Sequence, residues 1–156
     1  MSVTSPGPAD LTISVREDDE AGSTVPSNEQ SITSGSDFWY KVQSLNQGES
    51  AAQSVTFTIQ VSPTSAFSPS DASLVEVYVQ EAGQSSPQDV TSNATIDDTT
   101  STDAYTVTLP SLAAGAEATV VVPAEADANG GVVDAIANVT FTGGSAGPAT
   151  DDTTLQ

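Results

Sequence analysis

The fold class of this chain is decided by one stretch, Ser54-Val55-Thr56-Phe57-Thr58-Ile59-Gln60-Val61-Ser62-Pro63. Large apolar side chains occupy every second position, and threonine or glutamine lies between them. This alternation is typical of a β-strand that has one face in a core and the other in solvent. Proline has no backbone N–H to give to a sheet, so we expect the strand to end at Pro63.

Shorter alternating segments lie on both sides of this strand, with turn residues between them. We expect strands at residues 11–16, 36–45, 74–80, 105–109, 118–122 and 132–141, and a weaker one at 90–96. Pro110 and Pro123 are expected to close the two strands before them. No segment shows the sustained 3.6-residue apolar stripe of a helix. The sequence therefore predicts an all-β fold, an immunoglobulin-like antiparallel β-sandwich of about seven to nine strands.

The charge balance is extreme: 21 acidic residues face two basic ones, Arg16 and Lys41, which gives a formal net charge of −19. Such a chain would repel nucleic acid and anionic membrane surfaces, because both bind through lysine and arginine. An acidic disordered chain would lack the patterned apolar segments seen here. We favour adaptation to molar salt, where the Debye length falls to about 3 Å and self-repulsion is screened.

Several classes of chemistry lack their usual residues. The chain has no cysteine and no histidine, so disulfides, thiolate metal sites and histidine-based catalysis are excluded. No run of about 18 apolar residues could span a membrane, so no membrane insertion is expected. A serine nucleophile would have to use Lys41 as its base, and on these grounds we expect the protein not to be an enzyme. Without a basic and apolar leader after Met1, no secretory signal is expected.

Three runs of carboxylates could in principle bind a cation: Glu17-Asp18-Asp19-Glu20, Asp97-Asp98 and Asp151-Asp152. None has the spaced aspartates, glycine and distal glutamate of a calcium loop. We interpret all three as solvated surface of a halophilic protein. No catalytic, cofactor-binding or metal-binding residue is predicted, and no cofactor.

Two aromatic residues are candidate partner contacts. Trp39 lies on the strand face opposite Phe38 and Tyr40, so it would be exposed if those two are in the core, unless a loop covers it. Phe67 lies in a serine- and proline-rich loop. Asn93 and Asn138 begin N-glycosylation sequons, Asn93-Ala94-Thr95 and Asn138-Val139-Thr140, and the sequence leaves their modification open.

The order of several short motifs resembles an immunoglobulin-like repeat of bacterial and archaeal surface proteins, the CARDB-like conserved repeat. The matching segments are Ala9-Asp10-Leu11-Thr12-Ile13-Ser14-Val15, Ser34-Gly35-Ser36-Asp37-Phe38-Trp39-Tyr40-Lys41-Val42, Leu45-Asn46-Gln47-Gly48-Glu49-Ser50-Ala51-Ala52, residues 54–63, Leu112-Ala113-Ala114-Gly115-Ala116-Glu117-Ala118-Thr119-Val120 and Ala135-Ile136-Ala137-Asn138-Val139-Thr140. The resemblance implies a structural or adhesive role without a shared active site.

We divide the 156 residues into a flexible N-terminal arm at 1–8, a sandwich at 9–142 and a polar C-terminal tail at 143–156. Residues 64–103 are longer than in the repeat that the chain resembles, which indicates an inserted hairpin there.

The sequence leaves two functional hypotheses. The first is a non-enzymatic structural protein on the exterior of a haloarchaeal virus particle: a capsid decoration, turret or tail-associated protein. The alternative is a domain of a haloarchaeal cell-surface, pilus or adhesion protein. The expected partners are other virion or surface-layer proteins, further copies of the chain in a homo-oligomer, and a host-surface glycan. The virion hypothesis also predicts closed symmetry for the oligomer.

Overall fold

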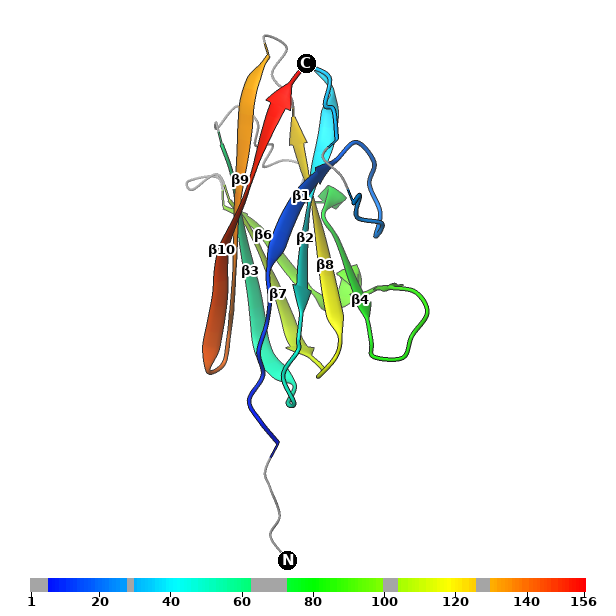
Figure 1. Cartoon of the computed structure of the whole chain (residues 1–156), viewed down its shortest axis with the longest axis vertical. Coiled ribbons are helices and arrows are strands. Elements are labelled where there is room, and N and C mark those ends of the chain that lie inside the picture. Colours follow the sequence, from blue (N-terminus) through cyan, green and yellow to red (C-terminus); the bar gives the residue numbers. More distant parts are fainter. Residues whose placement is uncertain (1–5, 28–29, 63–72, 100–103, 126–129) are drawn as a thin grey trace, which may run out of the picture.

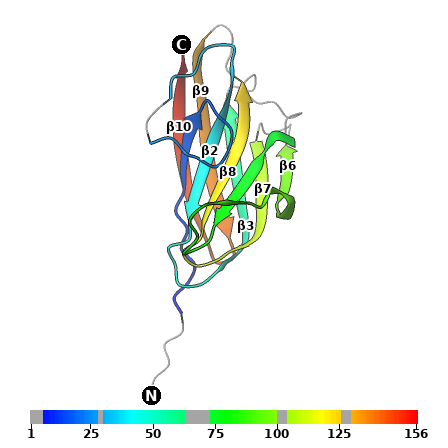
Figure 2. The same cartoon turned by 90° about the vertical axis from the view of Figure 1, so that its right-hand side faces the viewer.

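The computed structural model of this chain describes residues 6–27, 30–62, 73–99, 104–125 and 130–156. Two five-stranded sheets pack face to face and confirm the predicted all-β sandwich (Figures 1 and 2). One sheet holds, in spatial order, β1 (Ser14–Asp18), β2 (Asp37–Leu45), β8 (Glu117–Glu125), β4 (Glu76–Gln80) and β5 (Gln88–Asp89). The other holds β10 (Gly144–Leu155), β9 (Gly131–Phe141), β3 (Ala52–Ser62), β7 (Ala104–Leu112) and β6 (Thr95–Thr99). Each pair of neighbouring strands is antiparallel.

The core lies between the sheets and consists of the alternate positions that the sequence marked as apolar. On β3 these are Val55, Phe57, Ile59 and Val61, all fully buried. Phe38, Tyr40 and Val42 of β2 face them from the other sheet, as predicted for one of the two faces of that strand. The rings of Phe38 and Tyr40 meet edge to face with centroids 5.2 Å apart, a favourable arrangement for aromatic pairs.

Two strands continue through the prolines that were expected to end them. Pro110 lies inside β7 and Pro123 inside β8. Among the described residues, β6 pairs with β7 only as far as Thr108, and β4 pairs with β8 only as far as Val121. Each proline therefore lies where its strand has a partner on one side only, which is where a missing N–H is tolerated.

The C-terminal tail was predicted wrongly. Gly144–Leu155 forms β10, which pairs with β9 along most of its length. Thr153 and Leu155 are the buried side chains of this strand. Small and polar residues fill the remaining positions, so the strand carries almost no apolar periodicity for sequence reasoning to detect.

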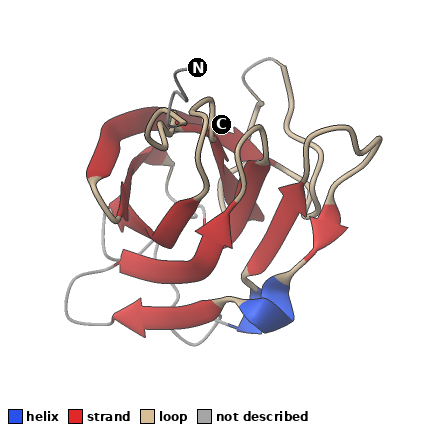
Figure 3. Ribbon diagram, turned by 90° about the horizontal axis from the view of Figure 1, so that it is seen from below, coloured by secondary structure: helices blue, strands red, loops and turns tan. Residues whose placement is uncertain are grey.

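One other boundary differs from the expectation, and the region 64–103 is described only in part. Gly7 and Pro8 of the expected flexible arm are held by backbone and side-chain hydrogen bonds to Glu49 and Ser50. Within 64–103, the described residues contain a short antiparallel pair, β4 and β5, and then a 3-10 turn, η3 (Thr91–Asn93). This turn lies at the periphery of the sandwich and leads the chain into β6 of the other sheet (Figure 3).

Among the residues that the structure describes, no helix has the length and apolar character needed to cross a bilayer.

Candidate functional site

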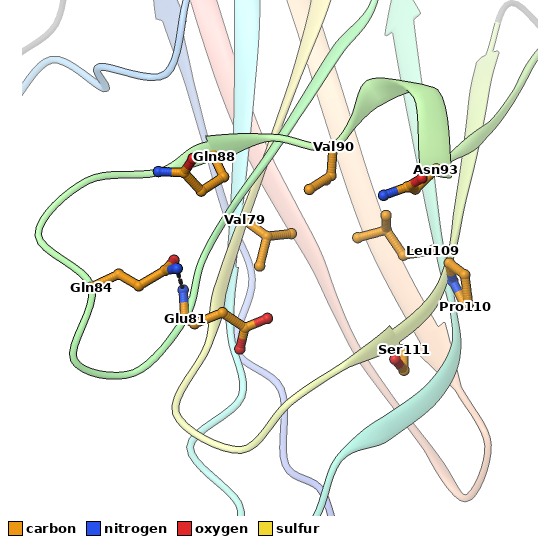
Figure 4. A pocket seen from close by; sticks show the side chains of 9 residues that line it. All are labelled: Val79, Glu81, Gln84, Gln88, Val90, Asn93, Leu109, Pro110 and Ser111. Carbon is orange, nitrogen blue, oxygen red and sulfur yellow. Dashed lines mark hydrogen bonds between the residues drawn. The ribbon is translucent and has the colours of Figure 1, made fainter.

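A pocket of about 490 Å³ opens at one edge of the sandwich, between the β4–β5 side of one sheet and the end of β7 in the other (Figure 4). Its position follows from two short strands. The two-residue β5 pairs only with Tyr78 and Val79. β6 pairs with β7 only as far as Thr108. Among the described residues, the rest of β7 therefore has no neighbouring strand on the β6 side.

Apolar and polar groups line this pocket in separate places. Val79 and Leu109 form a buried floor, and half-buried Val90 adjoins them. The other lining residues are Glu81, Gln84, Gln88, Asn93, Pro110 and Ser111. An apolar floor with a few polar groups is the usual form of a ligand site in proteins.

Local hydrogen bonds shape the rim at residues 80–84. Gln84 Oε1 accepts a hydrogen bond from the backbone N–H of Glu81 at 3.0 Å, and the Gln84 carbonyl accepts one from Gln80 Nε2 at 2.8 Å. The Glu81 carboxylate has no hydrogen-bond or ion-pair partner among the described residues. It extends from the loop toward the side of the pocket that Leu109, Pro110 and Ser111 form (Figure 4). The arrangement offers a carboxylate and three carboxamides for binding.

The first acidic run, Glu17-Asp18-Asp19-Glu20, is not uniformly solvated as predicted. Asp19 and Glu20 are exposed, whereas Glu17 and Asp18 are buried at 0% and 7% exposure. Asp18 lies on the outer face of β1 and accepts a hydrogen bond from Lys41 Nζ at 2.6 Å. The loop after β1 covers this ion pair, since Lys41 also donates to the Thr24 carbonyl. Burial of an acid is tolerated here because its counter-ion is buried with it.

Glu17 faces the opposite way, into the sandwich. Its Oε1 accepts a hydrogen bond from the Gln30 backbone N–H at 2.9 Å, and its Oε2 has no partner among the described residues. The Glu17 backbone N–H donates to Asp151 Oδ2 at 2.8 Å, so the first and third acidic runs meet at the seam between β1 and β10. Nearby, burial raises the pKa of the Tyr40 phenol well above its usual value.

These carboxylates do not assemble a cation site in the described part of the chain, where no three acidic groups come together as metal ligands would. In the second run, the Asp97 side chain is exposed on β6 and the side chain of Asp98 lies outside the described residues. In the third run, Asp152 lies directly opposite Asp134 of β9. Burial raises the pKa of Asp134, and the negative charge of Asp152 raises it further.

Among the described residues, Lys41 makes no hydrogen bond to a serine, although Ser14 and Ser27 line the same small pocket as its side chain. It lies on the outer face of β2, whereas the buried Ser44 is on the inner face. The lysine is occupied by Asp18 and by the Thr24 carbonyl.

The candidate contact residues have mixed outcomes. Trp39 is half-buried on the outer face of β2, between Asp18 on β1 and Pro123 on β8. Its role as a partner contact stays a prediction. Phe67 lies outside the described residues. Asn93 is exposed at the rim of the pocket, and Asn138 is half-buried on β9.

Sequence reasoning missed the pocket entirely. Its residues come from three stretches, 79–84, 88–93 and 109–111, and none of these forms a motif. The one available signal was the glycine-containing turn around Gly83, a residue that adopts a positive φ of 84°. Such a turn marks a loop but says nothing about what the loop lines.

No family model matches this sequence, and no curated protein matches it either. Solved structures with the same fold include the C-terminal domain of the antigen I/II-family protein AspA from Streptococcus pyogenes, with a TM-score of 0.65 and 14% identity over 92% of this chain. The major pilin SpaD from Corynebacterium diphtheriae gives 0.57 and 14% over 92%. The pilus backbone protein RrgB from Streptococcus pneumoniae gives 0.53 and 10% over 85%.

The chain spans only 46%, 33% and 32% of the length of these three proteins, in the same order. At this level of identity the likeness establishes the immunoglobulin-like sandwich and nothing finer.

Proposed function

We propose that this chain is a non-enzymatic spacer domain of a cell-surface or pilus-type protein, exposed outside the cell. One observation carries the proposal: the described chain enters the sandwich at one end of its long axis and leaves at the opposite end (Figures 1 and 2). A domain of this form extends a larger protein by its full length and transmits tension from end to end.

The N-terminal end is firmly attached to the sandwich. Asn46 is fully buried there. Its side-chain nitrogen donates to the carbonyls of Ser50 at 2.9 Å and Leu112 at 3.0 Å, and its oxygen accepts from Asp10 at 3.2 Å and Gly48 at 3.0 Å. All four hydrogen-bonding capacities of one carboxamide are thus used to join the entering chain to two loops.

The same end has a close backbone approach. A Cβ at Gly48 would lie 2.3 Å from the Pro8 carbonyl oxygen, so only glycine lets the entering chain pack against this turn. Backbone hydrogen bonds from Glu49 to Pro8 and from Gln47 to Asp10 complete the attachment.

The C-terminal end is attached in a comparable way. The Gln156 backbone N–H donates to the Ile32 carbonyl at 2.9 Å, and the Gln156 carbonyl accepts from Ser34 at 2.7 Å. Leu155 forms a parallel bridge with Ile32. Both ends of the described chain, where tension would be applied, are therefore hydrogen-bonded to the sandwich.

The similar structures support a surface role because two of them are pilins, although each is less than 25% identical to this chain. The expected place on the exterior of a virus particle has no comparable support from these structures. The halophilic setting, a homo-oligomer, neighbouring surface-layer proteins and a host-surface glycan stay predictions.

Density-gradient fractionation of the source culture in high salt, followed by mass analysis of each band, tests this proposal. We expect the chain in the cell-envelope or fibre fraction, within a longer polypeptide. Recovery at its own mass in a dense particle that contains DNA would favour the virion hypothesis and refute the surface role.

A further inference from the structure

We propose that the pocket between the β4–β5 edge and β7 binds a lysine or arginine side chain presented by a partner polypeptide. This goes beyond the spacer role, because it gives the domain a specific point of attachment on its flank. The spacer role does not require it.

The floor of the pocket suits the stem of such a side chain. Val79, Val90 and Leu109 lie together between the two sheets, with Pro110 beside them (Figure 4). Lysine and arginine bury their aliphatic stems along apolar surface and keep the charged end in a polar environment. The volume of about 490 Å³ lies in the usual range for ligand sites and leaves room for the flanking backbone.

The charged end of the ligand would meet Glu81, which is the one charged residue that the described part of the chain contributes to the lining. Its carboxylate has no partner among the described residues and extends into the pocket (Figure 4). A charge-assisted hydrogen bond to this carboxylate is stronger than one between neutral groups. Gln88 and Asn93 line the opposite side of the pocket (Figure 4), where their carboxamides can meet the peptide groups that flank the basic side chain.

The chain does not supply a cation of its own to this place. Its two basic residues, Arg16 and Lys41, lie on β1 and β2, at the other edge of the same sheet from β5. The ammonium group of Lys41 also forms an ion pair with the Asp18 carboxylate. A basic group at this place would therefore have to come from a partner.

Other ligand classes fit less well. A phosphate or carboxylate would be repelled by Glu81 and by the net charge of −19. A nucleobase is ordinarily held by stacking on an aromatic side chain, and the lining residues include no aromatic one. A neutral sugar would have only the carboxamides and Glu81 to hold it, and the experiment below distinguishes it.

The test uses the full chain in high salt and four acetyl-Gly-X-Gly amide peptides, in which X is arginine, lysine, norleucine or glutamate. Norleucine keeps the stem of lysine and lacks the ammonium group. Methyl NMR spectra report binding at Val79, Val90 and Leu109. We expect the arginine and lysine peptides to shift these methyl signals in a saturable way, with at least about tenfold tighter binding than norleucine. That ratio corresponds to about 1.4 kcal/mol, a modest value for a hydrogen bond to a charged group.

Glu81→Gln is the matched variant and Glu125→Gln the control, since both side chains are exposed and only the first lines the pocket. We expect Glu81→Gln to weaken the lysine and arginine peptides about tenfold and Glu125→Gln to leave them unchanged. Equal weakening by both variants, or shifts spread over the acidic faces, would mean unspecific attraction of cations and would overturn the proposal. So would equal binding of the norleucine peptide, absence of any shift, or tighter binding of N-acetylglucosamine at the same methyl groups.

Discussion

The ammonium group of Lys41 lies 2.6 Å from the carboxylate of Asp18, and both side chains are buried beneath the loop that follows β1. The two residues are diagonal neighbours on the outer face of β1 and β2, since Lys41 pairs in register with Arg16. An outer face normally meets solvent. Here the ion pair fixes the covering loop, because Lys41 also donates to the Thr24 carbonyl.

Replacing one member of this pair should be costly. We expect Lys41→Met to lower the free energy of unfolding by about 3 kcal/mol, because Asp18 is left buried without its counter-ion. Urea denaturation in high salt measures the change. The double variant Lys41→Met with Asp18→Leu should recover most of the loss, since no charge then stays unpaired. Additive losses in the double variant would show that the two residues act independently.

The hydroxyl of Tyr40 connects the two sheets. It donates to the Val133 carbonyl at 3.0 Å and shares a hydrogen bond with Thr153 Oγ1 at 2.8 Å. We expect Tyr40→Phe to lower stability by about 2 kcal/mol, because two buried polar groups lose their partner. Adding Thr153→Val should cost little more. A Tyr40→Phe protein that is as stable as the parent would contradict this account.

Asp134 and Asp152 face each other across β9 and β10. Burial and the charge of Asp152 raise the pKa of Asp134 in the folded protein. A carboxyl whose pKa is raised by folding favours the folded state below its unfolded pKa, and this contribution is lost as pH rises through the folded pKa. Asp134→Asn should therefore stabilise the protein at pH 7 by roughly 0.2–1 kcal/mol, and less at mildly acidic pH.

Asp97→Asn serves as the comparison for that variant, since Asp97 lies opposite Thr106 instead of another acid. It should give a smaller gain at pH 7. Thermal melts of both variants across the acidic range decide the matter, and a gain from Asp134→Asn that is independent of pH would count against repulsion between the two aspartates.

The net charge of −19 predicts a strong dependence of stability on salt. The melting temperature should rise steadily from dilute buffer to roughly 2 M sodium chloride, as the Debye length shortens and self-repulsion weakens. Chloride is the suitable salt, because sulfate would stabilise almost any folded protein by exclusion from its surface. A melting temperature that does not change with sodium chloride would remove the halophilic interpretation.

Sequence reasoning was most reliable where alternation was strict. Val55, Phe57 and Ile59 are buried as predicted, because a strand places every second side chain on one face. It failed for the prolines, because whether a proline ends a strand depends on the strand beside it. Pro110 and Pro123 lie inside strands, since the missing N–H of a proline matters only where a partner strand needs it.

The candidate site was less predictable than the fold. Glu17 and Asp18 belong to a run of four acids whose sequence predicts solvated surface. Asp18 is nevertheless paired with a lysine 23 positions away, and the Glu17 backbone contacts β10. Glu81 and Leu109 line one pocket because two strands stop short at one edge. Contacts between distant segments depend on register and strand length, which alternation does not specify.

Force spectroscopy shows whether the domain carries tension between its two ends. The chain has no cysteine, so cysteine handles can be placed at chosen positions. Handles at Pro6 and Gln156 pull from end to end, whereas handles at Pro6 and Thr142 pull at one end only. β1 and β10 both run toward the C-terminal end (Figure 1), so end-to-end tension shears their ladders and loads all hydrogen bonds together. We predict a clearly higher unfolding force for the end-to-end pair, and an equal or lower force would contradict the spacer role.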